Sequence, residues 1–276
     1  MKVLIFSGTH SRHAFFHECI LKNFNVCGAV VMERESTILG DSIKGQKNKK
    51  TEDWNIQDQT LYNYHFSKRN EIEKEYYQNK NTDLYYKYCD VLKVSPNELN
   101  SEKVEQFIKH KNPDLCFIFG TNIIKDNIVN IMPKWKINLH LGLSPWYRGS
   151  ATLFWPFYNL QPQFAGSTFH QIIQEPDAGN ILHQTVPDLE YGDSLHEVAA
   201  KVVVSSSKDV VHLLRKIEKG EEIQLHKQKN SGKNWLIRDF EPHHLRQIYN
   251  LYEDKIVDEW LNGNLGDRIP KTIKGF

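Results

Sequence analysis

The 276-residue chain is 39% hydrophobic and long enough to bury the core of one large domain. Its 35 basic and 34 acidic residues leave a formal net charge of +1, so no global field points to nucleic acid or to a membrane surface. No apolar run approaches the length of a signal peptide or a membrane span, and we therefore expect a cytoplasmic protein. Four cysteines without any C-x-x-C spacing favour buried thiols over disulfides.

The chain opens with the pattern of a strand, a turn and a helix. Residues 3–6 (VLIF) form an apolar run that Ser7, Gly8 and Thr9 close, and a helical pattern follows. Residues 27–32 (CGAVVM) predict the second strand. The Ser-Gly-Thr turn suits either a phosphate at the start of the following helix or a plain connection.

Residues 41–87 differ in composition from the segments on either side. They are rich in Asn, Gln, Lys, Glu and Tyr and contain good helix formers. We predict one or two exposed helices inserted between strands of the sheet. Because this stretch also carries Trp, Phe and many Tyr residues, a docked segment is favoured over a disordered linker.

Alternating strands and helices return at residue 90. Strands are predicted at 90–94, 115–120, 137–140, 166–173 and 181–184, and helices at 101–108, 126–132 and 194–219. This alternation predicts an α/β fold with a doubly wound, Rossmann-like, mostly parallel sheet over residues 1–219. Residues 220–276, with one strand-like piece and two short helices, are predicted to form a small C-terminal appendage.

Polar side chains gather at the ends of two neighbouring predicted strands. In INLHLGLSPWYRGS (137–150), Asn138 and His140 lie two residues apart and so face the same side of a strand end. His170 and Asp177 belong to the next strand and its loop, and ligands of open parallel sheets bind at such edges. A single histidine there is more often structural than catalytic, so the residues alone leave both roles open. No HExxH or dense His/Cys/Asp spacing appears, which argues against a metal site.

Two blocks of the sequence resemble those of a known family. INLHLGLSPWYRGSATLFW is similar to the formyltransferase signature, an Asn-x-His followed by a Leu-x-Pro-x-Tyr-Arg-Gly loop. GSTFHQIIQEPDAGNIL resembles the family's second block, a Thr-x-His strand followed by an Asp-Ala/Gly-Gly turn. The resemblance covers roughly residues 1–215 and implies a folate-dependent formyltransferase.

The resemblance also implies the catalytic residues. Asn138, His140 and Asp177 match the family's three catalytic positions, and His170 matches a position that supports Asp177 or the folate side. An amide and a protonated imidazole can donate hydrogen bonds to the oxygen of a formyl group under attack. Asp177 can orient His140 and help to take a proton from the attacking amine.

Binding positions for both substrates are implied by the same resemblance. The formyl donor would be N10-formyltetrahydrofolate, with its pterin held by Gly120, Thr121, Asn122, Ile123, Ile124, Gln174, Glu175 and Pro176. Phosphates of the acceptor would lie along Ser7, Gly8, Thr9, Arg12, Tyr147 and Arg148. A structural ion pair is the alternative for Arg148. The insertion at 41–87 is not shared with the family.

The acceptor class is inferred from the length of chain beyond the predicted catalytic domain. Only about 55 residues lie beyond 220, too few for the β-barrel of methionyl-tRNA formyltransferases, while the chain is longer than the purine enzymes. We therefore expect a nucleotide-linked amino sugar, formylated for surface carbohydrate synthesis such as that of lipopolysaccharide. Methionyl-tRNA formyltransferase and formyltetrahydrofolate hydrolase are the alternatives. No membrane or nucleic-acid partner is expected, and a homodimer stays one of the states open to the chain.

Overall fold

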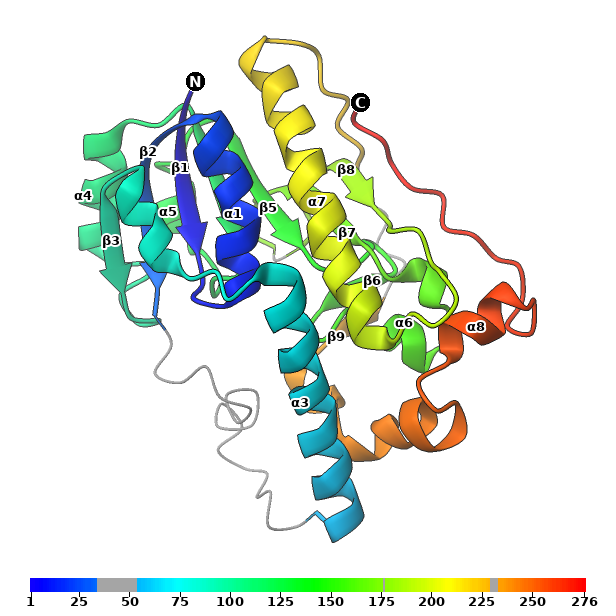
Figure 1. Ribbon diagram of the computed structural model, residues 1–276. Coiled ribbons are helices and arrows are strands. Elements are labelled where there is room, and N and C mark those ends of the chain that lie inside the picture. Colours follow the sequence, from blue (N-terminus) through cyan, green and yellow to red (C-terminus); the bar gives the residue numbers. More distant parts are fainter. Residues whose placement is uncertain (34–53, 176, 229–232) are drawn as a thin grey trace.

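A seven-stranded sheet forms the centre of the molecule in a computed structural model that describes residues 1–33, 54–175, 177–228 and 233–276 (Figure 1). Its strands are β1 (Lys2–Ser7), β2 (Asn25–Met32), β3 (Val91–Val94), β4 (Leu115–Phe119), β5 (Trp135–His140), β7 (Ser167–Gln171) and β8 (Ile181–Thr185). The order across the sheet is β3-β2-β1-β4-β5-β7-β8. The first five strands are parallel, whereas β7 and β8 run antiparallel to their neighbours.

Helices cover both faces of this sheet. They are α1 (Ser11–Asn23), α3 (Ile56–Tyr77), α4 (Glu102–Lys111), α5 (Asp126–Val129), α6 (Trp155–Tyr158), α7 (Leu195–Glu218) and α8 (Ile256–Leu261). Shorter turns of helix are η2 (Thr82–Lys87), η3 (Pro162–Phe164), η4 (Ile237–Asp239), η5 (Pro242–His244) and η6 (Gln247–Leu251). The predicted helix at 126–132 is shorter than expected, because the residue before Pro133 disfavours helical backbone.

The apolar run at the start of the chain is buried on both sides. Alternate side chains of a strand face opposite ways, so Val3 and Ile5 join the core under α1 and α7, while Leu4 and Phe6 join the core under α4 and α5. A strand buried on both faces reads as a continuous hydrophobic run, as residues 3–6 do. The prediction of a doubly wound, mostly parallel sheet is confirmed.

The long helix α7 begins and ends where its sequence indicates. Ser194 and Glu197 form a reciprocal capping box, in which each side chain accepts a hydrogen bond from the other residue's amide. Gly220 follows the helix with φ of 71°, a left-handed conformation that glycine adopts without strain.

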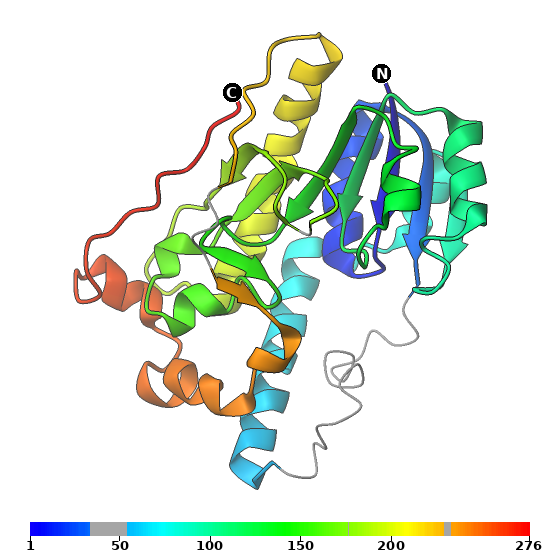
Figure 2. The same ribbon diagram turned by 180° about the vertical axis from the view of Figure 1, so that it is seen from behind.

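The insertion is helical, and its longer helix is docked instead of lying free in solvent. Part of the predicted 41–87 segment, residues 41–53, lies outside the described residues. Helix α3 packs against α7 and α1 and buries Tyr62, His65, Phe66 and Tyr77. Figure 2 shows it running away from the sheet, beside the C-terminal segment drawn in orange. The expectation of exposed helices therefore holds for only one side of α3.

The C-terminal segment packs on the loop that connects β5 to β7. Strand β9 (Lys233–Trp235) pairs in parallel with β6 (Tyr147–Gly149), and Trp235 stacks on Trp155 with ring centroids 3.9 Å apart. Leu245, Ile248, Ile256 and Val257 share a core cluster with Leu143 and Phe154. A division of the chain near residue 219 stays a prediction.

Two properties of the described residues bear on the expectations from composition. None of their helices has both the length and the apolar character needed to cross a bilayer. All four cysteines are free thiols, and Cys116 is fully buried.

Tyr85 joins the insertion to the sheet through one buried hydroxyl. Its Oη lies 2.9 Å from Ser7 Oγ and 2.9 Å from His17 Nδ1. Tyr85→Phe would leave both groups buried without this partner, and we expect a loss of about 1–3 kcal/mol in the free energy of unfolding, measured by denaturant titration. Tyr86→Phe removes the same hydroxyl from a side chain that is 55% exposed and should change little. Equal effects of the two substitutions would contradict the role of this hydroxyl.

Asp254 is expected to make the stability of the protein depend on pH. Burial raises the pKa of Asp254 to about 6, and the charge of Glu197 adds to the rise, although a hydrogen bond from the Leu195 amide opposes it. A carboxyl with a raised folded-state pKa contributes stability below its ordinary pKa of about 4 and loses that contribution as the pH rises through 6. Asp254→Asn keeps the acceptor oxygen and tolerates the left-handed backbone at this position (φ 59°).

We therefore expect Asp254→Asn to melt at a higher temperature than the wild type at pH 7–8. The difference should shrink as the pH approaches 4, since the wild-type carboxyl is then neutral. Glu253→Gln changes a neighbouring carboxyl whose side chain is 73% exposed, and it serves as the control. A lower melting temperature for Asp254→Asn at pH 7 would show that the carboxylate is needed in its charged form.

Candidate active site

The four polar residues predicted at the strand ends come together at one edge of the sheet. Strands β5 and β7 are neighbours, and their register places Asn138 directly opposite His170. Asn138 Nδ2 lies 3.1 Å from His170 Nε2. His140, two residues further along β5, faces the same side of the sheet, and its side chain is 7% exposed.

Asp177 reaches this group from a tightly constrained loop. Its backbone is left-handed (φ 52°), a conformation that aspartate tolerates better than most residues. Gly179 has no room for a side chain, because a Cβ there would lie 1.8 Å from the carbonyl oxygen of Gln171. Gln228, from the C-terminal segment, donates from Nε2 to the carbonyls of Asp177 (2.8 Å) and Gly179 (2.7 Å). The loop therefore holds the carboxylate in place from both sides.

The carboxylate of Asp177 lies between two imidazoles. Its Oδ2 is 3.5 Å from His140 Nδ1, and its Oδ1 is 3.4 Å from His170 Nε2. Burial alone would raise the pKa of Asp177, but the charge of His140 and the hydrogen bond from His170 outweigh it and hold this pKa well below its ordinary value. Asp177 is therefore ionised at neutral pH.

Both nitrogens of the His140 ring face oxygen atoms. Nε2 lies 3.0 Å from the carbonyl oxygen of Tyr147, opposite the nitrogen that faces Asp177. Gly142 makes this contact possible, because a Cβ at that position would lie 2.6 Å from both His140 Nε2 and the Tyr147 oxygen. Which of the two nitrogens donates depends on the tautomer of the ring.

His170 couples Asn138 to Asp177. Its Nδ1 donates to the carbonyl of Gln171 (2.8 Å), so the role of the other nitrogen depends on protonation. Without a proton, Nε2 accepts a hydrogen bond from the Asn138 amide. With a proton, it donates to Asp177. The NH2 group of Asn138 carries two hydrogens, so it can donate to a bound molecule even while one of them faces His170.

The loops predicted to hold a pterin lie beside this group. Ile123 (64% exposed) and Ile173 (45% exposed) present apolar side chains to solvent from two different loops, while Ile124 is buried. Gln174 Nε2 donates to Asp126 Oδ2 (3.0 Å), which ties the two loops together. Pro176 lies outside the described residues. Exposed apolar side chains on linked loops beside polar groups fit a flat heterocycle.

The residues predicted to bind the acceptor are not all in one place. Arg12 lines a cavity of about 450 Å³, together with Gly120 and Thr121. Ser7 is fully buried, and its hydroxyl contacts Tyr85 and the carbonyl of Gly8. Neither Gly8 nor Thr9 lines the cavity.

Tyr147 and Arg148 are held by other contacts. The Tyr147 hydroxyl donates to Gln161 (3.1 Å) and accepts from Asn159 (3.2 Å). Arg148 lies with Nη2 3.4 Å from Glu175 Oε1, the ion pair considered as its alternative role. This pair connects a residue predicted for the acceptor with one predicted for the donor.

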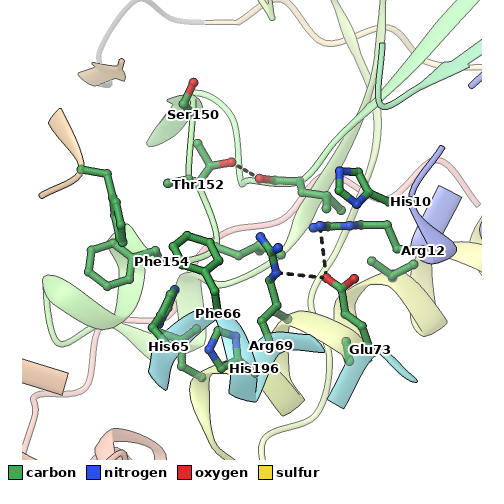
Figure 3. Close-up of a pocket in the computed structure, with 18 of the residues that line it drawn as sticks. His10, Arg12, His65, Phe66, Arg69, Glu73, Ser150, Thr152, Phe154 and His196 are labelled. Atoms are coloured by element: carbon green, nitrogen blue, oxygen red, sulfur yellow. Dashed lines mark hydrogen bonds and ion pairs between the residues drawn. The ribbon is translucent and has the colours of Figure 1, made fainter. Parts of the chain in front are cut away.

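Part of the cavity wall comes from residues that sequence reasoning did not select. Helix α3 contributes Tyr62, His65, Phe66, Arg69 and Glu73 to it. In Figure 3, Arg12 and Arg69 both point toward Glu73, and Phe66 and Phe154 lie on the opposite side of the close-up. The aromatic residues of the polar insertion were the one signal that this segment docks.

Comparison with known proteins identifies the family. A model of the formyl transferase family matches residues 1–214. The chain belongs to the formyl transferase family. The family resemblance of the two sequence blocks is therefore confirmed, and so is the prediction of a folate-dependent enzyme that uses N10-formyltetrahydrofolate as its formyl donor.

Solved structures agree with this fold. The formyltransferase is similar to phosphoribosylglycinamide formyltransferase from Anaplasma phagocytophilum (TM-score 0.54, 15% identity), which it matches over 85% of this chain and 98% of that one. A sugar N-formyltransferase from a Shewanella species matches with a TM-score of 0.54 and 20% identity over 87% and 78%. A 4-N formyltransferase from Francisella tularensis matches with a TM-score of 0.54 and 18% identity over 87% and 77%.

The arrangement of Asn138, His140 and Asp177 predicts that the three side chains act as a unit. Asn138→Ala, His140→Asn and Asp177→Asn should each lower kcat on the order of 10² or more, the usual cost of one preorganised donor in acyl transfer. The double substitution of His140 and Asp177 should cost far less than the product of the single effects. Asp177→Asn should also change the pH–rate profile, since the charge beside the imidazole is gone.

Thermal unfolding of the same variants provides the control. If the residues are catalytic, melting temperatures should stay near that of the wild type while kcat falls. Activity that falls only with the folded fraction, with independent effects in the double variant, would show that their role is structural.

Proposed function

We propose that this formyltransferase moves a formyl group from N10-formyltetrahydrofolate to the primary amine of a nucleotide-linked amino sugar. The observation that carries the proposal is a cavity at the end of β5. Among the described residues, Asn138, His140, His170 and Asp177 do not line it, but its wall includes the residue that follows His140. Leu141 follows His140 directly and lines the cavity, as does Thr152, whose hydroxyl donates to the Leu141 carbonyl. An acceptor bound there would have its amine close to His140.

Asn138 and His140 are proposed to stabilise the charge that develops on the formyl oxygen. The N–H groups of His140 already contact Tyr147 and Asp177, so the oxygen would compete for one of them. The amide of Asn138 is the second donor, because its NH2 group carries two hydrogens and the contact with His170 engages only one of them. Fixed donors aimed at a developing oxyanion are among the largest contributions to acyl-transfer catalysis.

Asp177 is proposed to orient His140 and to carry a proton only briefly. A carboxylate whose pKa lies well below its ordinary value is a weak base and does not retain a proton at neutral pH. The negative charge instead favours the doubly donating imidazole and accepts the amine's proton for the moment of transfer, directly or through water.

The acceptor class rests on the character of the cavity and on the names of similar proteins. A volume of about 450 Å³ suits a small molecule and not a tRNA stem. Two of the similar structures are called a sugar N-formyltransferase and a 4-N formyltransferase. We propose that the enzyme acts in the cytoplasmic synthesis of surface carbohydrate such as lipopolysaccharide.

A panel assay tests this proposal. The purified protein is incubated with N10-formyltetrahydrofolate and a set of nucleotide-linked amino sugars, and products are identified by mass spectrometry. We expect the donor to be consumed only when a primary amine acceptor is present, with a mass gain of one formyl group on the sugar.

Two outcomes would contradict it. Comparable consumption of the donor in water alone would indicate a formyltetrahydrofolate hydrolase. Formylation of methionyl-tRNA, with tight tRNA binding at physiological salt, would indicate the tRNA enzyme, since weak nucleic-acid binding is lost steeply as salt rises.

A further inference from the structure

Helix α3 supplies a basic side chain to the cavity that Arg12 lines. We propose that Arg69 of α3 and Arg12 of α1 together bind the diphosphate of the acceptor, which makes the insertion the element that recognises a nucleoside diphosphate sugar. This inference rests on the proposed function and adds to it the site of the phosphates.

The two guanidinium groups share a single carboxylate. Arg12 Nη2 lies 3.2 Å from Glu73 Oε1, and Arg69 Nε lies 3.9 Å from the same oxygen. The three side chains are 14–24% exposed, so their charges are poorly screened by water. Within this cluster two positive charges lie beside one negative charge, and Glu241 is the other carboxylate among the described residues that line the cavity.

Two buried hydrogen-bond donors of this cluster also indicate an anion as the ligand. The Nε atoms of Arg12 and Arg69 are buried, and neither has a hydrogen-bond partner among the residues that the structure describes. Burial and the neighbouring charge of Arg12 lower the pKa of Arg69 to about 10. A buried donor without a partner costs free energy, so an anion that accepts hydrogen bonds from these donors would stabilise the cluster.

The rest of the cavity suits the uncharged parts of such an acceptor. Phe66 from α3, Phe154 from the loop before α6 and Phe240 from the C-terminal segment line one wall. Phe154 and Phe240 meet edge to face with centroids 4.8 Å apart, and Phe66 lies 6.3 Å from Phe240. The guanidinium of Arg69 lies over the ring of Phe66, 4.6 Å from its centroid, so Phe154 and Phe240 offer the aromatic surface for a nucleobase or the apolar side of a deoxysugar.

A diphosphate is favoured over a single carboxylate by the shape of the donor set. Arginine presents a planar fork that matches phosphate oxygens in pairs, and two forks from different helices suit two linked phosphates. The glutamate tail of the folate is the other anion that could reach this cluster, and the kinetic test distinguishes the two.

The test compares Arg69→Gln with Lys68→Gln, the matched change at the neighbouring residue of α3, whose 44% exposed side chain pairs with Glu71. Calorimetry with UDP, dTDP, GDP, CDP and ADP measures binding, and KM is determined for the acceptor found in the panel assay and for the formyl donor. We expect wild type and Lys68→Gln to bind one of the diphosphates. Arg69→Gln should weaken that binding and raise the acceptor's KM about ten-fold or more, with the donor's KM within two-fold.

A second variant guards against loss of folding. Arg69→Lys keeps the charge and much of the packing but loses the fork, and it should weaken acceptor binding several-fold while melting like the wild type. The inference is overturned if Arg69→Gln and Arg69→Lys leave acceptor binding unchanged, if the donor's KM rises instead, or if the wild type binds none of the diphosphates. A wild type that formylates no nucleotide-linked amino sugar would refute the proposed function, an outcome visible without any variant.

Discussion

The position of the Asp177 carboxylate between His140 and His170 is the constraint on which the active site depends. It depends on the register of the antiparallel strands β5 and β7, which places Asn138 opposite His170. It also requires the left-handed turn at Asp177 and the absence of a side chain at Gly179. The seven-stranded sheet therefore fixes the ends of β5 and β7 and the loop at Asp177, and with them the positions of the polar side chains.

Two parts of the chain build two parts of the site. The sheet and its loops, which match the formyl transferase family, position Asn138, His140 and Asp177. The cavity next to them is closed by α3 and by the C-terminal segment, which contact each other outside the sheet. If α3 binds the acceptor as proposed, substitutions that change acceptor recognition would fall on an element separate from the strand ends.

The sequence predicted the features that depend on local pattern. The continuous apolar run at residues 3–6, the spacing of Asn138 and His140 and the helical pattern of residues 194–219 each indicate an element that the structure contains. It did not predict contacts between distant segments. Gln228 holds a loop 51 residues away, and Arg69 meets Arg12 through a shared glutamate on α3. The sequence predicted a phosphate beside Ser7, whereas in the structure the Ser7 hydroxyl contacts the hydroxyl of Tyr85 from the insertion. No periodicity in the sequence indicates this contact.

The low pKa of Asp177 is consistent with the proton balance of formyl transfer. The attacking amine loses one proton as its N–C bond forms, and the nitrogen of the departing tetrahydrofolate gains one as its bond to the formyl carbon breaks. No proton is taken up or released overall, so the enzyme needs a carrier that passes a proton on and not a base that stores it. In the proposed mechanism the Asp177 carboxylate, held between the two imidazoles, would pass the proton on instead of storing it.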